Sequence, residues 1–173
     1  MPPIGFSAAT VLDEVKAGAT LQSVTDAHSM DEIVAAVRDA LTGLRLGVSS
    51  LDEVALHRVA GLELWSIAEI AGHALAWEEA AHAVARSLAL GRAPVEVHLP
   101  YGEPGDPVAQ RDDLLARIQA AEVRLATARI LAAGGPTFAH AELGPLTARA
   151  WILFIGLHAA VHLHQAAAVV RAR

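Results

Sequence analysis

The most consequential absence in this sequence is cysteine, of which the 173 residues contain none. Disulfide bonds, zinc–cysteine sites, iron–sulfur clusters and a cysteine nucleophile are therefore excluded. The chain has 9 histidines, so any bound metal ion must be held by imidazole and carboxylate groups. Any thiol chemistry requires a thiol that another molecule supplies.

Positive charge and phosphate-binding motifs are also scarce. The 13 basic residues are outnumbered by 19 acidic residues, which gives a formal net charge of −6. This balance argues against a nucleic-acid-binding protein and against binding to anionic membranes. The sequence shows no glycine-rich phosphate loop, nucleotide fingerprint or Ser-His-Asp order. Residues 1–18 lack the basic start and continuous apolar core of a secretory signal, so we expect a cytoplasmic protein.

Aromatic residues make up only 4% of the chain, whereas alanine accounts for 38 of its 173 residues. Because alanine is the best helix former and aromatic residues favour strands, this composition predicts an all-α protein. Apolar residues recur at intervals of three and four in four long segments, as is typical of a four-helix bundle. These segments are residues 31–46, 66–91, 106–134 and 147–173, the third beginning with an N-cap at Asp106 and Pro107 at the first helical position.

Three serines are each followed three residues later by glutamate, namely Ser29, Ser50 and Ser66. In such a capping box the hydroxyl and the carboxylate satisfy free amide groups at a helix N-terminus. The pattern predicts that helices begin at these serines. The helix after Ser50 is expected to be short, with one or two turns within residues 50–61.

The N-terminal residues precede the first long helix. We assign residues 1–28 to an N-terminal extension and residues 29–173 to the bundle domain. The extension is predicted to contain one short helix over residues 10–16.

The last predicted helix is apolar enough that it could either span a membrane or lie in the core of the bundle. Residues 150–170 contain no Asp, Glu, Lys or Arg, and they are long enough to span a bilayer. The segment nevertheless contains His158, His162, His164 and Gln165, and polar groups at membrane depth are costly without partners. The other three helices are amphipathic and need an apolar partner. We therefore interpret this segment as the central helix, buried in the bundle and at a dimer contact, with no membrane interaction.

Residues 91–106 interrupt the helical pattern with several prolines and glycines. Within them, residues 95–99 alternate and can form a short extended piece, although no partner strand is evident. A loop of this length is uncommon in a compact domain and often covers a functional site. We therefore treat His98, which lies in this loop, as a candidate pocket residue.

Three histidines can converge in the core of such a bundle. His158 and His162 are four residues apart and lie on one helical face. His73 lies on the apolar face of the second long helix, between Ile70 and Trp77. Three neutral imidazoles bind Zn or Ni and leave coordination positions open. Core histidines bonded to backbone carbonyls explain the same spacing, and the spacing alone leaves both interpretations open.

Two motifs in this sequence resemble those of a known family. Residues 65–73 resemble the W-S-x-x-E-x-x-x-H segment of the DinB-like (DinB/YfiT) superfamily, and residues 158–165 resemble its H-x-x-x-H-x-x-Q pattern. Residues 143–151 also resemble the family's lead-in to its last helix. The resemblance covers roughly residues 31–170. It implies an up-down-down-up four-helix bundle, usually a homodimer, with a divalent metal ion held by three histidines.

The resemblance assigns the metal ligands to His73, His158 and His162. It also implies a metal-dependent enzyme with a small-molecule substrate, because known relatives include transferases and isomerases that use low-molecular-weight thiols such as bacillithiol or mycothiol. A thiol-dependent S-transferase or isomerase is the expected function. A metal-dependent hydrolase and a non-catalytic metal-binding or stress-response dimer are the alternatives. Val161 and the Leu163-His164 pair stand where many relatives have His and Arg-Gly, which leaves the substrate open.

Several other residues have both a functional and a structural interpretation. Trp77 and Trp151 can form pocket walls or belong to the core, and Gln165 can orient a metal ligand. Glu69 can be a fourth ligand or a base, but its place in a capping box favours a structural role. The remaining histidines are expected at the surface or at helix caps, and His164 either at a subunit contact or in solvent: His28, His57, His82, His98, His140 and His164.

Overall fold

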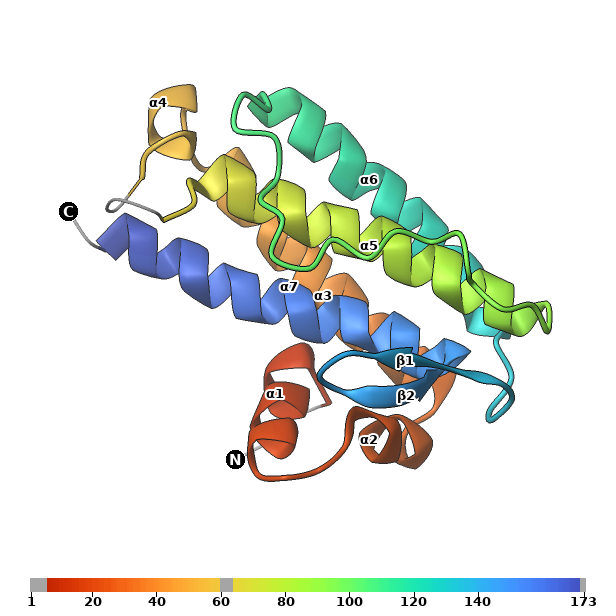
Figure 1. Ribbon diagram of the computed structural model, residues 1–173. Helices are drawn as coiled ribbons and strands as arrows, with labels where there is room; N and C mark the ends of the chain where they lie inside the picture. Colours follow the sequence, from red (N-terminus) through yellow and green to blue (C-terminus); the bar gives the residue numbers. More distant parts are fainter. Residues whose placement is uncertain (1–5, 60–63, 172–173) are drawn as a thin grey trace.

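The computed structural model describes residues 6–59 and 64–171 (Figure 1). Four long helices form a bundle, which confirms the predicted fold class. Three of them begin and end within three residues of the segments that the apolar periodicity predicted, and the third long helix is shorter than predicted at both ends. The four helices are α3 (Met30–Ser49), α5 (Ile67–Ala89), α6 (Arg111–Thr127) and α7 (Ala148–Arg171).

The bundle has the up-down-down-up topology. Figure 1 shows α3 and α7 running in one direction and α5 and α6 in the other. Both α3 and α5 pack against α7 on one side and against α6 on the other. The approach of α7 to α3 is close at Gly156, where a Cβ atom would lie 3.2 Å from the Cα atom of Val37. Small residues on the packed faces thus allow the helices to approach closely.

The chain between α5 and α6 must return along the bundle because these two helices are parallel. Residues 90–110 run back beside α5 (Figure 1). Near the end of this loop the Gly105 amide donates to the Glu69 carbonyl at 2.9 Å. A Cβ atom on Gly105 would lie 2.6 Å from the Cα atom of Gly72. Two glycines therefore let the loop lie directly on α5, and residues 95–99 form no strand there.

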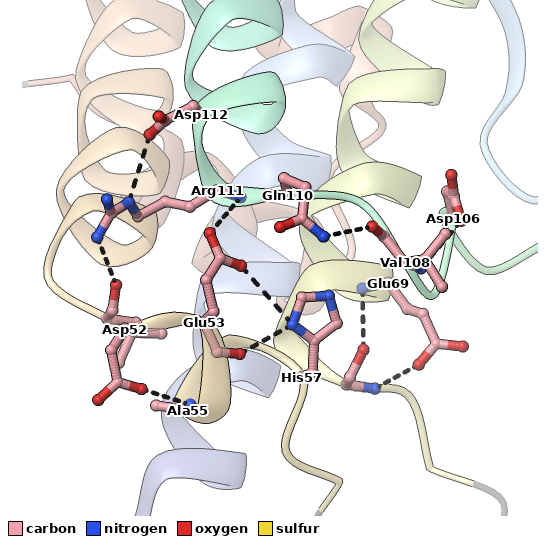
Figure 2. Close-up of polar contacts among 12 residues, drawn as sticks. Asp52, Glu53, Ala55, His57, Glu69, Asp106, Val108, Gln110, Arg111 and Asp112 are labelled. Carbon is pink, nitrogen blue, oxygen red and sulfur yellow. Dashed lines mark hydrogen bonds and ion pairs between the residues drawn. The ribbon is translucent and has the colours of Figure 1, made fainter.

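Two of the three predicted capping boxes are present. The Ser29 and Ser66 side chains cap α3 and α5. Ser50 instead ends α3, where its hydroxyl donates to the Gly47 carbonyl at 2.9 Å. The short helix α4 (Glu53–Leu56) is capped by Asp52, whose carboxylate accepts from the Ala55 amide (Figure 2). Residues 60 and 61 of the predicted segment lie outside the described residues.

The predicted start of the third long helix at Asp106 is wrong. The Asp106 carboxylate accepts from the Val108 amide at 3.0 Å and closes a local turn, and α6 begins at Arg111 (Figure 2). At Gly105 the chain is still held against α5, so residues 106–110 are needed to reach the line of α6. The Glu53 carboxylate accepts from the Arg111 amide at 3.1 Å. The helix also ends earlier than predicted, at Thr127, followed by a 3₁₀ turn, η1 (Ala128–Ile130).

The N-terminal residues pack against the bundle as two short helices. The predicted helix is α1 (Ala8–Lys16), and a second helix, α2 (Leu21–Ala27), was not predicted. Both contact α7, and they bury Val11 and Val24 in the same core as the bundle.

A short antiparallel hairpin of β1 (Thr137–His140) and β2 (Gly144–Thr147) precedes α7 and was not predicted. In its register Thr137 lies opposite Thr147, and His140 lies opposite Gly144. The hairpin connects the end of α6 to the start of α7 and contacts α2 and α5. It thereby places His140 beside the bundle.

The helix α7 is long and apolar enough to cross a membrane by length and composition, and half of its most apolar window is buried within the protein. Residues 150–157 are buried throughout. Since α3 and α5 both pack on α7, its apolar character is that of the core helix of a soluble helical domain.

Candidate metal centre

Three predicted ligands lie together between α5 and α7. One ring nitrogen from each of His73, His158 and His162 can serve as a metal ligand, and these atoms all lie within 4.8 Å of one another. The Nε2 atoms of His158 and His162 are 3.1 Å apart. The ring of His73 lies with its centroid 5.1 Å from that of His158 and 4.8 Å from that of His162. The structure thus brings the three rings into one cluster.

Carbonyl oxygens fix the orientation of two of these rings. The Nδ1 atom of His73 donates to the Glu103 backbone carbonyl at 2.6 Å. The Nδ1 atom of His162 donates to the Gln165 side-chain oxygen at 2.8 Å. Because a carbonyl oxygen only accepts, both neutral rings carry their proton on Nδ1 and present an Nε2 lone pair to the cluster. This is the tautomer that metal-ligating histidines need.

The donor set fits a metal ion. The lone pair on His162 Nε2 faces the Nε2 atom of His158, so a proton or a cation must lie between them. The Nδ1 atom of His158 is buried and has no hydrogen-bond partner among the described residues. Three converging imidazole nitrogens match the preference of Zn and Ni for this ligand.

Burial keeps these imidazoles neutral. It lowers the pKa of His158 to about 2, with smaller contributions from His162, His73 and His140. Burial also lowers the pKa values of His73 and His162 below the usual range. Neutral rings are the form that binds a metal ion, so protons do not compete for the cluster at neutral pH.

The long loop positions the acceptor for His73. Gly105 anchors the loop on α5 beside Gly72, and Glu103 lies two residues before this anchor. The Glu103 carboxylate contacts His98, whose side chain is 73% exposed. His98 therefore lies outside the pocket, although it contacts the residue whose backbone orients His73.

A pocket of about 390 Å³ opens beside the histidine cluster. Helix α1 contributes Leu12 and Val15 to its wall, so the N-terminal segment completes the site. Among the described residues, Glu142 is the only acidic residue of the lining, and no Arg or Lys lines it. The other lining residues are the three clustered histidines with Trp77, Tyr101, Gly102, His140, Leu143, Phe154, Leu157 and Val161.

The two candidate tryptophans have different places. Trp77 lines the pocket, with its ring centroid 4.8 Å from that of Tyr101 and 5.5 Å from that of His158. Trp151 is fully buried behind the pocket, and its indole N–H donates to the Phe138 carbonyl at 3.2 Å. Of the two, only Trp77 can touch a bound ligand.

His140 lies in the pocket wall, a position that we did not predict. We expected a surface or capping residue, but its side chain is 5% exposed. It packs against Phe154 at a ring distance of 4.8 Å and against Trp77 at 5.4 Å. Burial lowers its pKa. The two strands of the hairpin that carries it have four residues each, too few for a clear alternating pattern in the sequence.

The remaining histidines and Glu69 lie away from the cluster. The Glu69 carboxylate accepts from the Ser66 amide at 2.7 Å, which confirms the capping role (Figure 2). His57 bonds to the Glu53 carbonyl (Figure 2), and the exposed His164 bonds to the Ala160 carbonyl. The rest stack or pair locally, His28 with Phe6 and His82 with Glu78.

Comparison with known proteins agrees with the observed helical bundle. The structure is similar to the crystal structure of TT2238, described as a four-helix bundle protein, with a TM-score of 0.62 and 20% sequence identity. The similarity covers 81% of this chain and 99% of that chain, and at this identity it concerns the fold alone. No curated protein matches the chain. The family model of the DinB superfamily matches residues 33–166, a range that includes all three clustered histidines. The chain therefore belongs to the DinB superfamily.

Proposed function

We propose that this protein is a metal-dependent enzyme that binds one divalent ion, Zn or Ni, through His73, His158 and His162. The observation that supports this most directly is the convergence of the three rings at the wall of a 390 Å³ pocket. Two of the rings are already held by carbonyl oxygens in the ligating tautomer. A non-catalytic metal-binding protein needs no such pocket, so the pocket favours an enzyme.

The proposed reaction is the transfer of a low-molecular-weight thiol to an electrophilic small molecule, or a thiol-dependent isomerisation. A divalent ion held by three neutral imidazoles supplies a Lewis acid that lowers the pKa of a thiol or water ligand. The chain contains no cysteine, so the thiol must enter from solution. Hydrolysis by water is the alternative and uses the same ligands.

The pocket lining indicates the kind of small molecule that fits. Trp77, Tyr101 and Phe154 form an aromatic part of the wall, and α1 adds the apolar side chains of Leu12 and Val15. These side chains exclude water and favour an apolar body. Since no Arg or Lys is among the described lining residues, an uncharged or cationic compound suits the pocket better than a polyanion.

Metal content is the first test. Elemental analysis of purified and zinc-reconstituted protein is expected to give a stoichiometric divalent ion for wild type and for His164→Ala. His164 is on the same helix but exposed. His162→Ala is expected to lose the ion. Wild type without a stoichiometric ion contradicts the metal site, and a His162→Ala protein that keeps the ion contradicts the ligand assignment.

Thiol dependence is the second test. The metal-loaded protein is mixed with an aromatic electrophile such as 1-chloro-2,4-dinitrobenzene, with and without 2-mercaptoethanol, and the thioether is measured by absorbance. Thioether formation above that of His162→Ala supports transfer. Turnover of ester substrates without added thiol instead supports a hydrolase.

We also propose that the protein is a cytoplasmic homodimer. The resemblance to a family whose members are usually dimeric supports the dimer. Sedimentation equilibrium without detergent tests the dimer. A monomer at micromolar concentration contradicts it.

A further inference from the structure

His140 is the pocket histidine that the metal cluster leaves unused. It lies at the end of β1, lines the same pocket as His73 and His158, and is 5% exposed. It does not belong to the cluster of potential metal ligands. Its ring is held between Phe154 and Tyr101, at centroid distances of 4.8 and 5.3 Å. The ring therefore has a fixed place beside the proposed metal site.

The hairpin turn determines which nitrogen of His140 carries the proton. The backbone amides of Glu142 and Leu143 both donate to its Nδ1 atom, at 3.2 and 3.4 Å. A ring nitrogen that accepts hydrogen bonds must present a lone pair, so the neutral ring carries its proton on Nε2. Nε2 makes no hydrogen bond to any residue in the part of the chain that the structure describes.

A second contact holds this turn against the long loop. The Ala141 amide donates to the Tyr101 hydroxyl at 2.9 Å. Tyr101 lies in the loop that also supplies the Glu103 carbonyl to His73. One loop thus helps to set both the ligating tautomer of His73 and the position of His140.

The pocket consequently presents two opposite kinds of nitrogen. His73 and His162 present lone pairs, whereas His140 presents an N–H group. We infer that His140 donates a hydrogen bond from Nε2 to an oxygen of the substrate bound at the metal site, and that the substrate is an uncharged compound with a carbonyl-type oxygen. This inference rests on the proposed function. As a nucleophile adds to the carbonyl carbon, the π pair moves onto this oxygen, and the N–H group stabilises the developing charge while keeping its proton.

The tautomer can be tested without metal or substrate. Long-range ¹H–¹⁵N spectra of metal-free wild type at pH 7.5, with His140→Gln used for assignment, distinguish protonated from unprotonated ring nitrogens. We expect the proton of His140 on Nε2. A proton on Nδ1 overturns the proposed role of His140, whatever the protein does with metal.

The donor role can be tested with two small molecules that bind to the metal ion. Cobalt-loaded protein is titrated with acetate, which has a second oxygen able to accept a hydrogen bond, and with ethanethiol, which has none. The visible absorption of cobalt reports binding. His140→Phe keeps a flat ring but no donor, and we expect it to weaken acetate binding about tenfold and to leave ethanethiol binding unchanged. His140→Gln, which retains an N–H group, is expected to recover part of the acetate affinity.

The outcomes separate this inference from the proposed function. Unchanged acetate binding in His140→Phe overturns the donor role, and an equal loss for both probes shows that His140 only packs the pocket. His57→Phe, remote from the pocket, serves as the control and should bind both probes like wild type. A wild type that takes up no metal ion overturns the proposed function, and with it this use of His140.

Discussion

Two buried polar clusters share helix α5, and they are satisfied in different ways. In the metal cluster, His73 meets His158 and His162, and neutral lone pairs converge with no positive charge from the described residues between them. One to two turns further along, Glu78 is 1% exposed, and its carboxylate accepts hydrogen bonds from Arg124. His82 Nδ1 lies 2.8 Å from the same carboxylate. The second cluster pairs opposite charges within the protein, whereas the first consists of neutral rings whose nitrogens can hold a cation.

Cavity size does not distinguish the proposed metal site from the second cluster. A cavity of about 640 Å³ lies beside the second cluster, lined by His82 and Arg124 among others. The pocket beside the metal cluster measures about 390 Å³. In the larger cavity Arg124 is already paired with Glu78 and lies near Glu79. The clusters differ in that three ring nitrogens converge beside the smaller cavity, whereas Arg124 and Glu78 pair with each other beside the larger one.

The largest expected difference between the clusters is in metal binding. We expect His158→Ala to abolish stoichiometric metal uptake, because it removes one of the three ring nitrogens that can hold the ion. His82→Ala, on the neighbouring helix and in the other cluster, should keep wild-type metal content. Elemental analysis after reconstitution and dialysis measures both. Equal metal content in the two variants would remove the functional distinction drawn between the clusters.

The second difference is in stability. Glu78→Gln removes the counter-charge of Arg124 and is expected to lower the free energy of unfolding by about 2–3 kcal/mol, since Arg124 is partly exposed and recovers some hydration. Metal content should not change. Urea unfolding measures the effect, with Glu79→Gln as the control. Glu79 is 46% exposed, and losing its ion pair should cost under about 1 kcal/mol.

The third prediction concerns the loop that supports only the metal cluster. In Gly105→Ala the new Cβ atom would meet the backbone of Gly72 at 2.6 Å, so the loop must move. We expect a loss of about 1–3 kcal/mol in stability. We also expect metal affinity to fall about tenfold, because the Glu103 carbonyl moves away from His73.

A glycine in ordinary packing provides the control for the loop variant. In Gly47→Ala the Cβ atom would lie 3.9 Å from the nearest Leu163 atom. This variant should match or slightly exceed wild-type stability, because alanine favours the helix. Competition with a chromophoric chelator measures metal affinity in both. An unchanged affinity in Gly105→Ala would show that the loop does not set the orientation of His73.

The clusters should also lose their contributions in different pH ranges. In the metal-free folded protein, burial lowers the pKa of His73, His158 and His162. Unfolded histidines take up protons below a pKa of about 6.5. The unfolded state then binds more protons, so stability falls as the pH drops below about 6.5.

Glu78 loses its contribution in the same direction but at lower pH. Burial alone would raise its pKa, but contacts with His82 and Arg124 outweigh this effect and lower it. Its contribution is therefore complete above about pH 4.3 and is lost only as the pH falls further.

Urea unfolding of metal-free protein should show that the free energy of unfolding falls by about 1–2 kcal/mol between pH 7 and 5.5. Glu78→Gln should retain this loss, and His158→Gln should reduce it.

Much of the bundle and of the metal cluster could be predicted because both depend on local spacing. The apolar period of three to four residues gave the four long helices, and the capping boxes at Ser29 and Ser66 gave the starts of two of them. The four-residue interval between His158 and His162 places both rings on one face of α7. His73 lies on the apolar face of a second helix, and the packing of these two helices brings its ring to those of His158 and His162.

The parts that were missed depend on contacts between segments distant in sequence. The acceptor for His73 is a backbone carbonyl at Glu103, and a carbonyl has no side-chain signature. The hairpin that carries His140 has four-residue strands, too short for a clear period. Helix α2 is similarly short. Asp106 showed a valid capping pattern, but the close contact of Gly105 with α5 delayed the helix.

The smallest expected effect separates orientation from ligation within the metal cluster itself. Gln165 is exposed and touches the site only through its side-chain oxygen, which accepts from His162 Nδ1 at 2.8 Å. Gln165→Ala should therefore leave stability unchanged and weaken metal binding about tenfold, because His162 loses the partner that fixes its tautomer. Gln165→Glu keeps an acceptor and should bind at least as well as wild type. Equal affinities for all three proteins in chelator competition would show that packing alone orients the histidines. The contrast with the second cluster would then rest only on the three ring nitrogens.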